Sequence, residues 1–504
     1  MNSTKHPRNL FIVAVLMIVP ILLQAQVDGG RQKVGREILK KAESAPRITR
    51  GAPYPAVTPP EFPKNMEAKR QIIPTGKLVG DMKPANKAIY ALDGRKKYRP
   101  DLKKLNTLSF KDYREQTNSI PAASGCCPEV SVAENEQTII TTGNTWMALS
   151  TNGGVNFNSI NPSTIFPQDD GGFCCDQVVH YIPKYDIFVW LLQYRRHPVD
   201  TLKNRIRIAA QKTSEVISSN GTSWTYWDFP SDVFSAKGTL DYSDLGWGDE
   251  SLWWAIQNAD GRVVSRIPLK ELAAKITVHY AFTAGTDALW SHVTQNATNT
   301  VYWAGHVSNS EMRVYDMRDG DGYYSWHSVT VNSWPNGTNT SKCPGGDDWL
   351  LPFEDWKHYV FGNTLQRGKV WFSWEAAPGG GFPQSHVQLV KINPATWTKE
   401  EQVQIWNPDF AFMDAYLSTN NEQAIGMEVA FGGGIYYPSS AVGIWGDFVV
   451  YYPRLSTRCV GRWGDYNHSR RCTANGADWI AGGYTNESNA SGNIVIPHYI
   501  RFGR

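Results

Sequence analysis

Two pairs of acidic and tryptophan residues lie close together in the chain and combine the groups that a sugar-cleaving site uses. Asp348 precedes Trp349, and Glu354 and Asp355 precede Trp356. Paired carboxyl groups can divide the roles of acid and of base or nucleophile in glycoside hydrolysis. The face of an indole ring can pack against the C–H groups of a sugar. We therefore predict the three acids as catalytic residues and the two tryptophans as ligand-binding residues. The alternative is a solvated acidic loop that its tryptophans anchor to the core.

A second set of acids recurs near the starts of the strands that we expect. If one such aspartate per sheet points inward, the sheets share an acidic funnel that can bind sugar hydroxyls. Calcium would also suit it, since carboxylate and carbonyl oxygens are the ligands of this ion. The alternative is that each aspartate caps the turn before its strand. The ligand-binding candidates of this set are Asp176, Asp241, Asp244, Asp287, Asp414 and Asp465.

The elements that must position these acids are short β-strands. From about residue 120 onward, aromatic or β-branched runs alternate with Gly/Asn/Asp turns, as at 137–144, 186–194, 300–306 and 369–375. Successive runs mostly lie roughly 40–70 residues apart, and repeats of about 40–50 residues indicate propeller blades. We predict an all-β fold over 126–504, a six- or seven-bladed β-propeller. Loops and inner-strand ends around its channel would form the site.

The amino terminus predicts export. Lys5 and Arg8 precede an apolar stretch over 10–23, and Ala25 offers a small residue for cleavage. This is the pattern of a signal peptide, here residues 1–25. A membrane anchor is the alternative, but a span needs about 20 apolar residues. The expected location is therefore secreted, periplasmic or at the cell surface, and not membrane-spanning.

Residues 26–125 differ in composition from the rest of the chain. They are rich in Pro, Lys and Arg, contain no Trp and carry a net charge of roughly +11, against roughly −10 for 126–504. Proline fixes φ and lacks the donor of an inner strand, as at 52–63. We predict a basic, Pro-rich arm or linker, which either stays solvated or lies across the acidic domain. Export and an acidic folded part argue against nucleic acid as a partner.

The seven cysteines show no C-x-x-C spacing of a zinc site, and disulfides are expected in an oxidising compartment. Cys459 and Cys472 flank a short loop and are predicted to pair. The doublets at 126/127 and 174/175 would form one bond between neighbouring sheets, or adjacent cysteines would bond to each other. Cys343 is then expected as the unpaired, buried thiol.

Three phrases carry a resemblance to a known family. The segment 150–157 looks like a degenerate Asp-box, with Asn152 in place of the aspartate. The segments 241–247 (DYSDLGW) and 462–466 (RWGDY) resemble phrases of secreted bacterial BNR/sialidase-like β-propellers. Much of that family has no assigned activity, so the resemblance implies the fold more than the function. It also implies that these phrases open inner strands, and it adds as ligand-binding candidates Arg462, Trp463 and Tyr466.

Together these patterns predict an exported β-propeller that recognises a glycan or polysaccharide at its axial funnel. The residues leave cleavage open. An enzyme of this kind would be a glycoside hydrolase or resemble a polysaccharide lyase. The three-arginine clamp of a true sialidase cannot be assembled from spacing alone. The alternative is a non-catalytic surface or assembly protein that uses the propeller rim for protein contacts.

Overall fold

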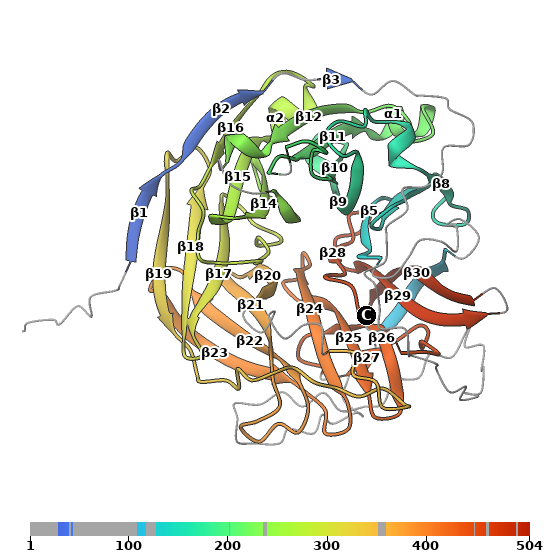
Figure 1. Ribbon diagram of the computed structural model, residues 1–504, viewed down its shortest axis with the longest axis vertical. Helices are drawn as coiled ribbons and strands as arrows, with labels where there is room; N and C mark the ends of the chain where they lie inside the picture. Colours follow the sequence, from blue (N-terminus) through green and yellow to red (C-terminus); the bar gives the residue numbers. More distant parts are fainter. Residues whose placement is uncertain are drawn as a thin grey trace, which may run out of the picture.

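The computed structural model describes residues 29–39, 42–43, 108–116, 128–200, 202–234, 239–350, 359–447, 449–459, 463–489 and 492–504. These residues form an all-β protein whose sheets surround a common centre (Figure 1). The α-helices α1 (Thr213–Ser218) and α2 (Leu269–Ala273) are short, as are the 3-10 turns η1 (Pro162–Thr164), η2 (Pro183–Tyr185) and η3 (Ser231–Val233). Within the described part of the chain, no helix has the length and apolar character needed to cross a membrane.

Three antiparallel sheets follow one another in the first half of the ring. The first contains β5 (Ser131–Asn135), β6 (Thr138–Thr142), β7 (Met147–Ser150) and β8 (Asn158–Ile160). The second contains β9 (Phe173–Ile182), β10 (Ile187–Tyr194), β11 (Arg205–Lys212) and β12 (Thr225–Pro230). The third contains β13 (Asp241–Trp247), β14 (Ser251–Asn258), β15 (Gly261–Pro268) and β16 (Val278–Phe282).

Two further sheets continue the ring. The fourth contains β17 (Thr300–Ser308), β18 (Glu311–Arg318) and β19 (Tyr323–Thr330). The fifth contains β20 (Val360–Gln366), β21 (Lys369–Ala376), β22 (His386–Asn393) and β23 (Thr398–Ile405). The segment 291–296 runs parallel to β20, because His292 N donates to Val360 O (3.0 Å) and Gln295 N to Asn363 O (2.8 Å). Thr294 N also donates to Tyr302 O of β17 (3.0 Å), so this segment extends the fourth sheet on its inner side.

The remaining strands form an eight-stranded sheet that divides naturally into two. One half contains β24 (Ala411–Thr419), β25 (Ile425–Gly433), β26 (Tyr436–Ile444) and β27 (Val450–Tyr451). The other contains β28 (Ser469–Arg471), β29 (Trp479–Asn489), β30 (Gly492–Gly503) and β4 (Ser109–Glu115). The pairing Ser439↔Thr485 joins the halves. Counted this way, seven four-stranded units surround the centre, an arrangement consistent with the blades of a propeller.

The described parts of the basic segment lie on the outer edges of these sheets. The strands β1 (Gly29–Lys33), β2 (Gly35–Leu39) and β3 (Ala42–Glu43) pair with β19, β16 and β12, so this stretch passes along three sheets in turn (Figure 1). The strand β4 completes the last sheet by pairing with β30. The predicted signal peptide and the Pro-rich 52–63 lie outside the described residues.

Apolar clusters join each sheet to its neighbours. One cluster combines Val178 of the second sheet with Val263 of the third, and another combines Val314 of the fourth with Phe372 of the fifth. A further cluster contains Ile139, Met413 and Ile480, and therefore closes the ring between the first and last sheets. Each buried indole can remove about 150–250 Å² from water. The fully buried tryptophans are Trp146, Trp190, Trp224, Trp227, Trp253, Trp254, Trp303, Trp334, Trp349, Trp374, Trp463 and Trp479.

The Asp-box-like hairpin folds as its sequence indicates. Asn152 Oδ1 accepts a hydrogen bond from Asn156 N (3.0 Å), and Ser150 Oγ accepts one from Gly154 N (2.9 Å). Gly153 and Gly154 have φ of +65° and +84°. Asparagine replaces the usual aspartate here because its carbonyl oxygen caps the same turn.

The disulfides differ from those predicted. Cys343 bonds to Cys459, and Cys174 bonds to its neighbour Cys175. The predicted Cys459–Cys472 bond is therefore wrong. Cys472 instead lies buried with its thiol 2.7 Å from a Glu134 carboxyl oxygen. Proximity in sequence misled the prediction, because Cys459 and Cys472 contact different neighbours, Cys343 and Glu134. The doublet at 126/127 lies outside the described residues.

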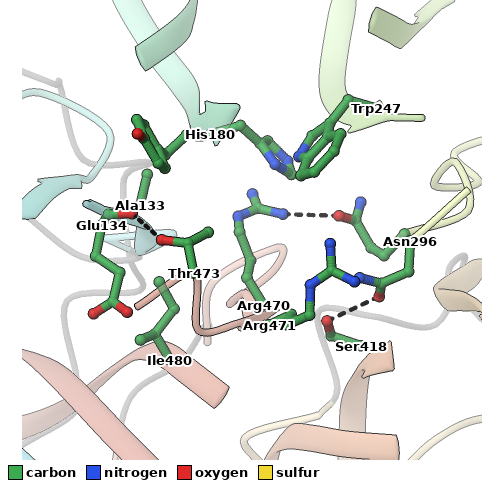
Figure 2. A pocket seen from close by; sticks show the side chains of 12 residues that line it. Ala133, Glu134, His180, Trp247, Asn296, Ser418, Arg470, Arg471, Thr473 and Ile480 are labelled. Atoms are coloured by element: carbon green, nitrogen blue, oxygen red, sulfur yellow. Dashed lines mark hydrogen bonds between the residues drawn. The ribbon is translucent and has the colours of Figure 1, made fainter. Parts of the chain in front are cut away.

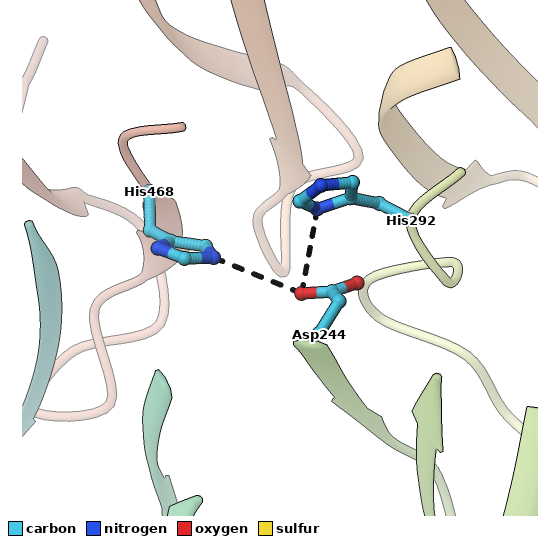
Figure 3. Close-up of side chains that lie close together, drawn as sticks. All are labelled: Asp244, His292 and His468. Atoms are coloured by element: carbon cyan, nitrogen blue, oxygen red, sulfur yellow. Dashed lines mark ion pairs between the residues drawn. The ribbon is translucent and has the colours of Figure 1, made fainter. Parts of the chain in front are cut away.

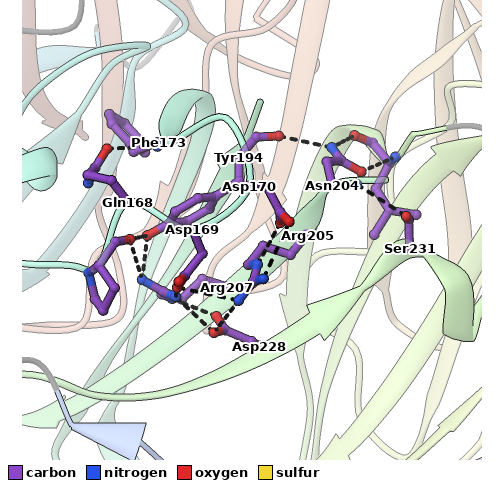
Figure 4. Close-up of polar contacts among 12 residues, drawn as sticks. Gln168, Asp169, Asp170, Phe173, Tyr194, Asn204, Arg205, Arg207, Asp228 and Ser231 are labelled. Atoms are coloured by element: carbon purple, nitrogen blue, oxygen red, sulfur yellow. Dashed lines mark hydrogen bonds and ion pairs between the residues drawn. The ribbon is translucent and has the colours of Figure 1, made fainter. Parts of the chain in front are cut away.

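A charged network stabilises the second sheet away from the centre (Figure 4). Arg207 is fully buried and pairs with Asp228 (2.6 Å) and Asp169 (2.8 Å), while its guanidinium lies 4.1 Å from the centre of the Tyr226 ring. Arg205 lies nearer the surface and pairs with Asp228 (3.0 Å) and with Asp170. The arrangement joins β11 and β12 to the loop before β9, and it explains why a cation is tolerated among aromatic rings.

Candidate functional site

The inner strands of three sheets are bulged where they enter the ring. Asp176 in β9, Tyr242 in β13 and Asp414 in β24 have φ of +45°, +52° and +52°, and the pairing register shifts beside each of them. Positive φ is uncommon for residues other than glycine. Bulges redirect side chains and are frequent next to functional sites, as is backbone strain. The same distortion in three sheets therefore marks the beginnings of the inner strands.

Aromatic rings converge from four sheets at this end of the ring. The ring of Tyr242 meets that of Trp290 edge to face at 5.4 Å and that of Tyr466 at 5.9 Å. Tyr359 lies 5.6 Å from Trp290 between ring centres. Trp290 is half-buried, whereas the three tyrosines are buried. The Trp290 indole thus packs against buried tyrosines and still reaches solvent.

Carboxyl groups lie near two of these buried tyrosines, Tyr242 and Tyr466. Asp176 Oδ2 accepts a hydrogen bond from Tyr242 N (3.2 Å), and Asp241 Oδ1 accepts one from Gln193 (2.8 Å). Asp465 N donates to Glu129 Oε1 (3.3 Å), and Tyr242 Oη donates to Asp465 O (3.3 Å). Asp241 is exposed and Asp465 is half-buried. We call this group the acidic mouth, composed of Glu129, Asp176, Asp241, Trp290 and Asp465.

The structure brings most of the recurring aspartates together. Asp176, Asp241 and Asp465 lie in the acidic mouth. Asp244 lies further along β13 and Asp414 lies in β24, and both are fully buried. Asp287 does not join them. Its carboxylate contacts Arg313 and Tyr315 of β18, the strand behind β17, so it is an ion-pair partner within the fourth sheet.

The predicted acid–tryptophan site is only partly described. Asp348 Oδ1 accepts hydrogen bonds from Ser341 N (2.9 Å) and Leu350 N (3.0 Å), and Oδ2 accepts one from Thr340, so this carboxylate holds its own loop together. Trp349 and Trp463 are fully buried and meet at 6.1 Å, so neither can stack on a ligand as predicted. Asp348 and Trp349 therefore agree with the alternative of an acidic loop anchored to the core, since the carboxylate accepts hydrogen bonds from the loop backbone and the indole is buried. Four candidates lie outside the described residues: Glu354, Asp355, Trp356 and Arg462.

The predicted Asp414 lies with two buried glutamates that were not predicted, Glu375 and Glu428. Burial raises the pKa of Glu375 to about 7, while hydrogen bonds from Asp414 oppose the rise. Burial and then repulsion by Glu375 raise the pKa of Asp414, and burial raises that of Glu428. Asp414 N also donates to Glu375 Oε1 (3.2 Å). Both glutamates interrupt apolar strand runs in the sequence, and this signal could have found them.

A second unpredicted group combines one carboxylate and two imidazoles (Figure 3). Asp244 Oδ1 lies 3.5 Å from His292 Nδ1 and 3.7 Å from His468 Nε2, and all three side chains are buried. Burial lowers the pKa of His292 to about 3, with Arg262 adding to the effect and Asp244 opposing it. Burial also lowers the pKa of His468. Both imidazoles are therefore neutral.

These three residues come from three sheets: β13, the inner segment 291–296 and the residue before β28. Among the described residues they form the group of His, Cys, Asp and Glu side chains with metal-binding proximity, their ligand atoms lying within 4.8 Å of one another. Two nitrogen donors do not suit calcium, which takes oxygen ligands. The calcium prediction thus finds no support in this donor set.

A polar cavity opens at the opposite ends of the inner strands (Figure 2). A narrow part of about 30 Å³ is lined by His180, Arg470 and Gln295, with Arg470 donating to Gln295 Oε1 (3.1 Å). A wider neighbouring part of about 260 Å³ is lined by Trp247 and Arg471. Arg470 links this cavity to the Asp244–His292–His468 group. It lines the cavity, and the nearby Asp244 carboxylate favours its positive charge.

Comparisons with known proteins give similarity to solved structures alone. No family model matches the sequence, and no curated protein matches it. The chain is similar to an α-L-arabinofuranosidase of Fusarium graminearum, with 11% identity and a TM-score of 0.35 over 74% of this chain and 93% of that one. It is similar to a sialidase of Trypanosoma rangeli, with 8% identity and a TM-score of 0.35 over 78% of this chain and 60% of that one. A protein of unknown function from Dyadobacter fermentans matches with 8% identity and a TM-score of 0.39 over 79% of this chain and 100% of that one. These scores carry no argument about activity.

Proposed function

We propose that this protein is a seven-bladed β-propeller that binds a glycan at the acidic mouth. The observation that carries the proposal is the half-buried Trp290, which packs on Tyr242, while Tyr242 in turn contacts Asp176, Asp241 and Asp465 where the inner strands begin. Carboxylate oxygens accept hydrogen bonds from sugar hydroxyls, and an indole face packs against sugar C–H groups. The mouth offers both on one surface.

The mouth is also rigid enough to select a ligand. The backbone of Trp290 has φ of +58°, and its N–H donates to Gln257 Oε1 (3.0 Å). Tyr242 and Tyr359 both pack against the indole. A ring fixed in this way loses little side-chain entropy when a sugar binds, which favours affinity.

The proposal concerns glycan binding. Whether the glycan is also cleaved depends on candidate residues that lie outside the described ranges. Glu354 and Asp355 precede Tyr359 in the chain and remain candidates for catalysis. A carboxyl pair of a glycosidase stands about 5–10 Å apart. An activity screen on plant and bacterial polysaccharides, with Glu354→Gln and Asp355→Asn as variants, tests that role separately from binding.

We propose that the protein works outside the cytoplasm, with residues 1–25 as its signal peptide. Two disulfides point to an oxidising compartment, because reducing conditions keep most cytosolic thiols free. Mass spectrometry of the mature amino terminus tests this. A chain that begins near residue 26 is expected, and an intact amino terminus on the exported protein would contradict it.

A glycan array followed by calorimetry on the best ligand tests the binding proposal. Trp290→Ala should weaken binding roughly tenfold or more, equivalent to about 1.4 kcal/mol, because the stacking surface is lost. Asp241→Asn, at an exposed position, should weaken binding without affecting the fold. Trp247→Ala is the matched control, a half-buried indole at the other end of strand β13.

Circular dichroism and melting curves establish that each variant is folded. If Trp247→Ala abolishes binding while Trp290→Ala leaves it unchanged, the ligand enters from the other end and the acidic mouth is not the site. If no glycan binds to the folded wild-type protein, the alternative of a non-catalytic surface protein is favoured.

A further inference from the structure

Asp244, His292 and His468 are arranged like the ligands of a metal ion. The atoms that they turn toward one another make no hydrogen bond within the described residues. Among the described residues, Asp244 Oδ1, His292 Nδ1 and His468 Nε2 have no hydrogen-bond partner, although all three side chains are buried. Leaving a buried polar atom unpaired costs about 1–3 kcal/mol. Three such atoms facing one point indicate that something else is bound between them.

The distances fit a small divalent ion. A tetrahedral zinc ion has ligands at about 2.0–2.2 Å, which places those ligand atoms roughly 3.3–3.6 Å from one another. The carboxylate oxygen of Asp244 lies 3.5 Å and 3.7 Å from the two imidazole nitrogens. The two imidazole nitrogens lie within 4.8 Å of each other, so the rings would move inward to close on an ion.

The outer contacts of the ligands fix their orientation. His292 Nε2 lies 3.2 Å from Tyr416 Oη; in the tautomer that a metal ligand needs, Nε2 donates its proton to the tyrosine and the Nδ1 lone pair faces Asp244. The other oxygen of Asp244 accepts a hydrogen bond from Val293 N (2.8 Å). Such second contacts are usual for imidazole and carboxylate ligands of metals, since they set the tautomer and the ring angle.

From this geometry we propose that Asp244, His292 and His468 bind a divalent first-row transition metal ion, with zinc as the probe. Imidazole and carboxylate ligands suit such ions. The site is fully buried, so the ion would be structural. It would connect the third, fourth and seventh sheets across the centre of the ring, below the acidic mouth. This role is independent of glycan binding.

The competing explanation is electrostatic. Arg262 and Arg470 are both buried, and the Asp244 carboxylate supports the positive charge of each. In that case Asp244 would be a counter-charge that needs no metal. The two explanations predict different metal content for the folded protein.

The test uses the purified full-length protein from zinc-supplemented medium. Elemental analysis is expected to find about one metal ion per chain, and stripping the ion with a chelator should lower the melting temperature reversibly. Cobalt loaded into the stripped protein should give visible d–d absorption bands. His468→Gln should lower metal affinity by about 100-fold. His386→Gln is the matched control, because His386 is as deeply buried but bonds to Gln384 O (3.2 Å) and Gln388 (2.9 Å) in the fifth sheet.

Tyr416→Phe separates positioning from ligation, since it removes only the outer contact of His292. It should weaken metal binding about tenfold and leave the cobalt bands present. Wild-type protein without stoichiometric metal, without cobalt bands and without a melting shift on zinc addition would overturn the proposal and leave Asp244 as a counter-charge. Equal metal loss in His386→Gln and His468→Gln would also overturn it. If His468→Gln does not fold, the cobalt spectrum of the wild type decides.

Discussion

A buried charged side chain in this fold is stabilised by its ion-pair partners, and Arg207 is the clearest example. Its guanidinium is fully buried, while its partners Asp169 and Asp228 keep 39% and 25% of their side-chain surface exposed. Removing one partner of a fully buried pair costs about 3–5 kcal/mol. Because these carboxylates stay partly solvated, we expect Arg207→Ala to lower the free energy of unfolding by about 2–3 kcal/mol.

Denaturant unfolding measures this cost, and Arg205→Ala provides the comparison. Arg205 bonds to Asp170 and Asp228 but keeps 23% of its side-chain surface in solvent. Arg205→Ala should therefore lower the free energy of unfolding clearly less than Arg207→Ala does. Equal losses for the two variants would show that burial of the guanidinium does not decide the effect.

The buried acids below the mouth make stability depend on pH. The pKa of Glu375 is raised to about 7 when the protein is folded, and Asp414 and Glu428 shift in the same direction. A carboxyl group with a raised pKa binds its proton more tightly in the folded state. Its contribution to stability is complete below the unfolded value, near 4.5, and is lost as the pH rises through about 7.

We therefore expect the melting temperature to fall between about pH 5 and pH 8. Glu375→Gln, which keeps the shape and removes the ionisation, should reduce this fall. The charged groups that face the pair are Glu428 and Asp465, so some pH dependence should remain. A melting curve series at constant ionic strength checks the prediction. An unchanged slope in Glu375→Gln would exclude this group as the cause.

At the scale of elements, local patterns predicted strands well and long-range partners poorly. The recurring aspartates converge because each occupies the same place in its repeat, as Asp176 and Asp414 do. The prediction is wrong for Asp287, because its carboxylate pairs with Arg313 of β18 and does not join the other aspartates. His292 could not be found from spacing, since its partners Asp244 and His468 belong to other sheets. The Cys343–Cys459 bond spans 116 residues and has no local signal either.

The outer strands were the least predictable elements. The strands β1, β2 and β3 lack the alternation of a half-buried strand, because their pairing adds them at sheet edges by backbone hydrogen bonds. Their basic, Pro-rich surroundings indicated a linker. Composition describes the side chains of a segment, whereas edge pairing uses the backbone that all residues share.

For the whole molecule, the decisive question is how the ring closes. The strand β4 pairs along β30 from Ser109↔Gly503 to Glu115↔His498, and Tyr113 Oη lies 2.8 Å from His498 Nδ1. Glu115 adds an ion pair to Arg454 (2.8 Å). The last sheet therefore joins residues from both ends of the chain, and the closing strand comes from before residue 125.

Two truncations test the importance of this closure. A chain starting at residue 108 keeps β4 and should stay folded, since the second, third and fourth sheets retain their other strands. A chain starting at residue 126 loses β4 and leaves the edge of β30 unpaired, so we expect a melting temperature lower by several degrees and a tendency to aggregate. Melting curves and light scattering on both chains decide between them. If both melt alike, the ring closes through the apolar cluster of Ile139, Met413 and Ile480 without needing the shared sheet.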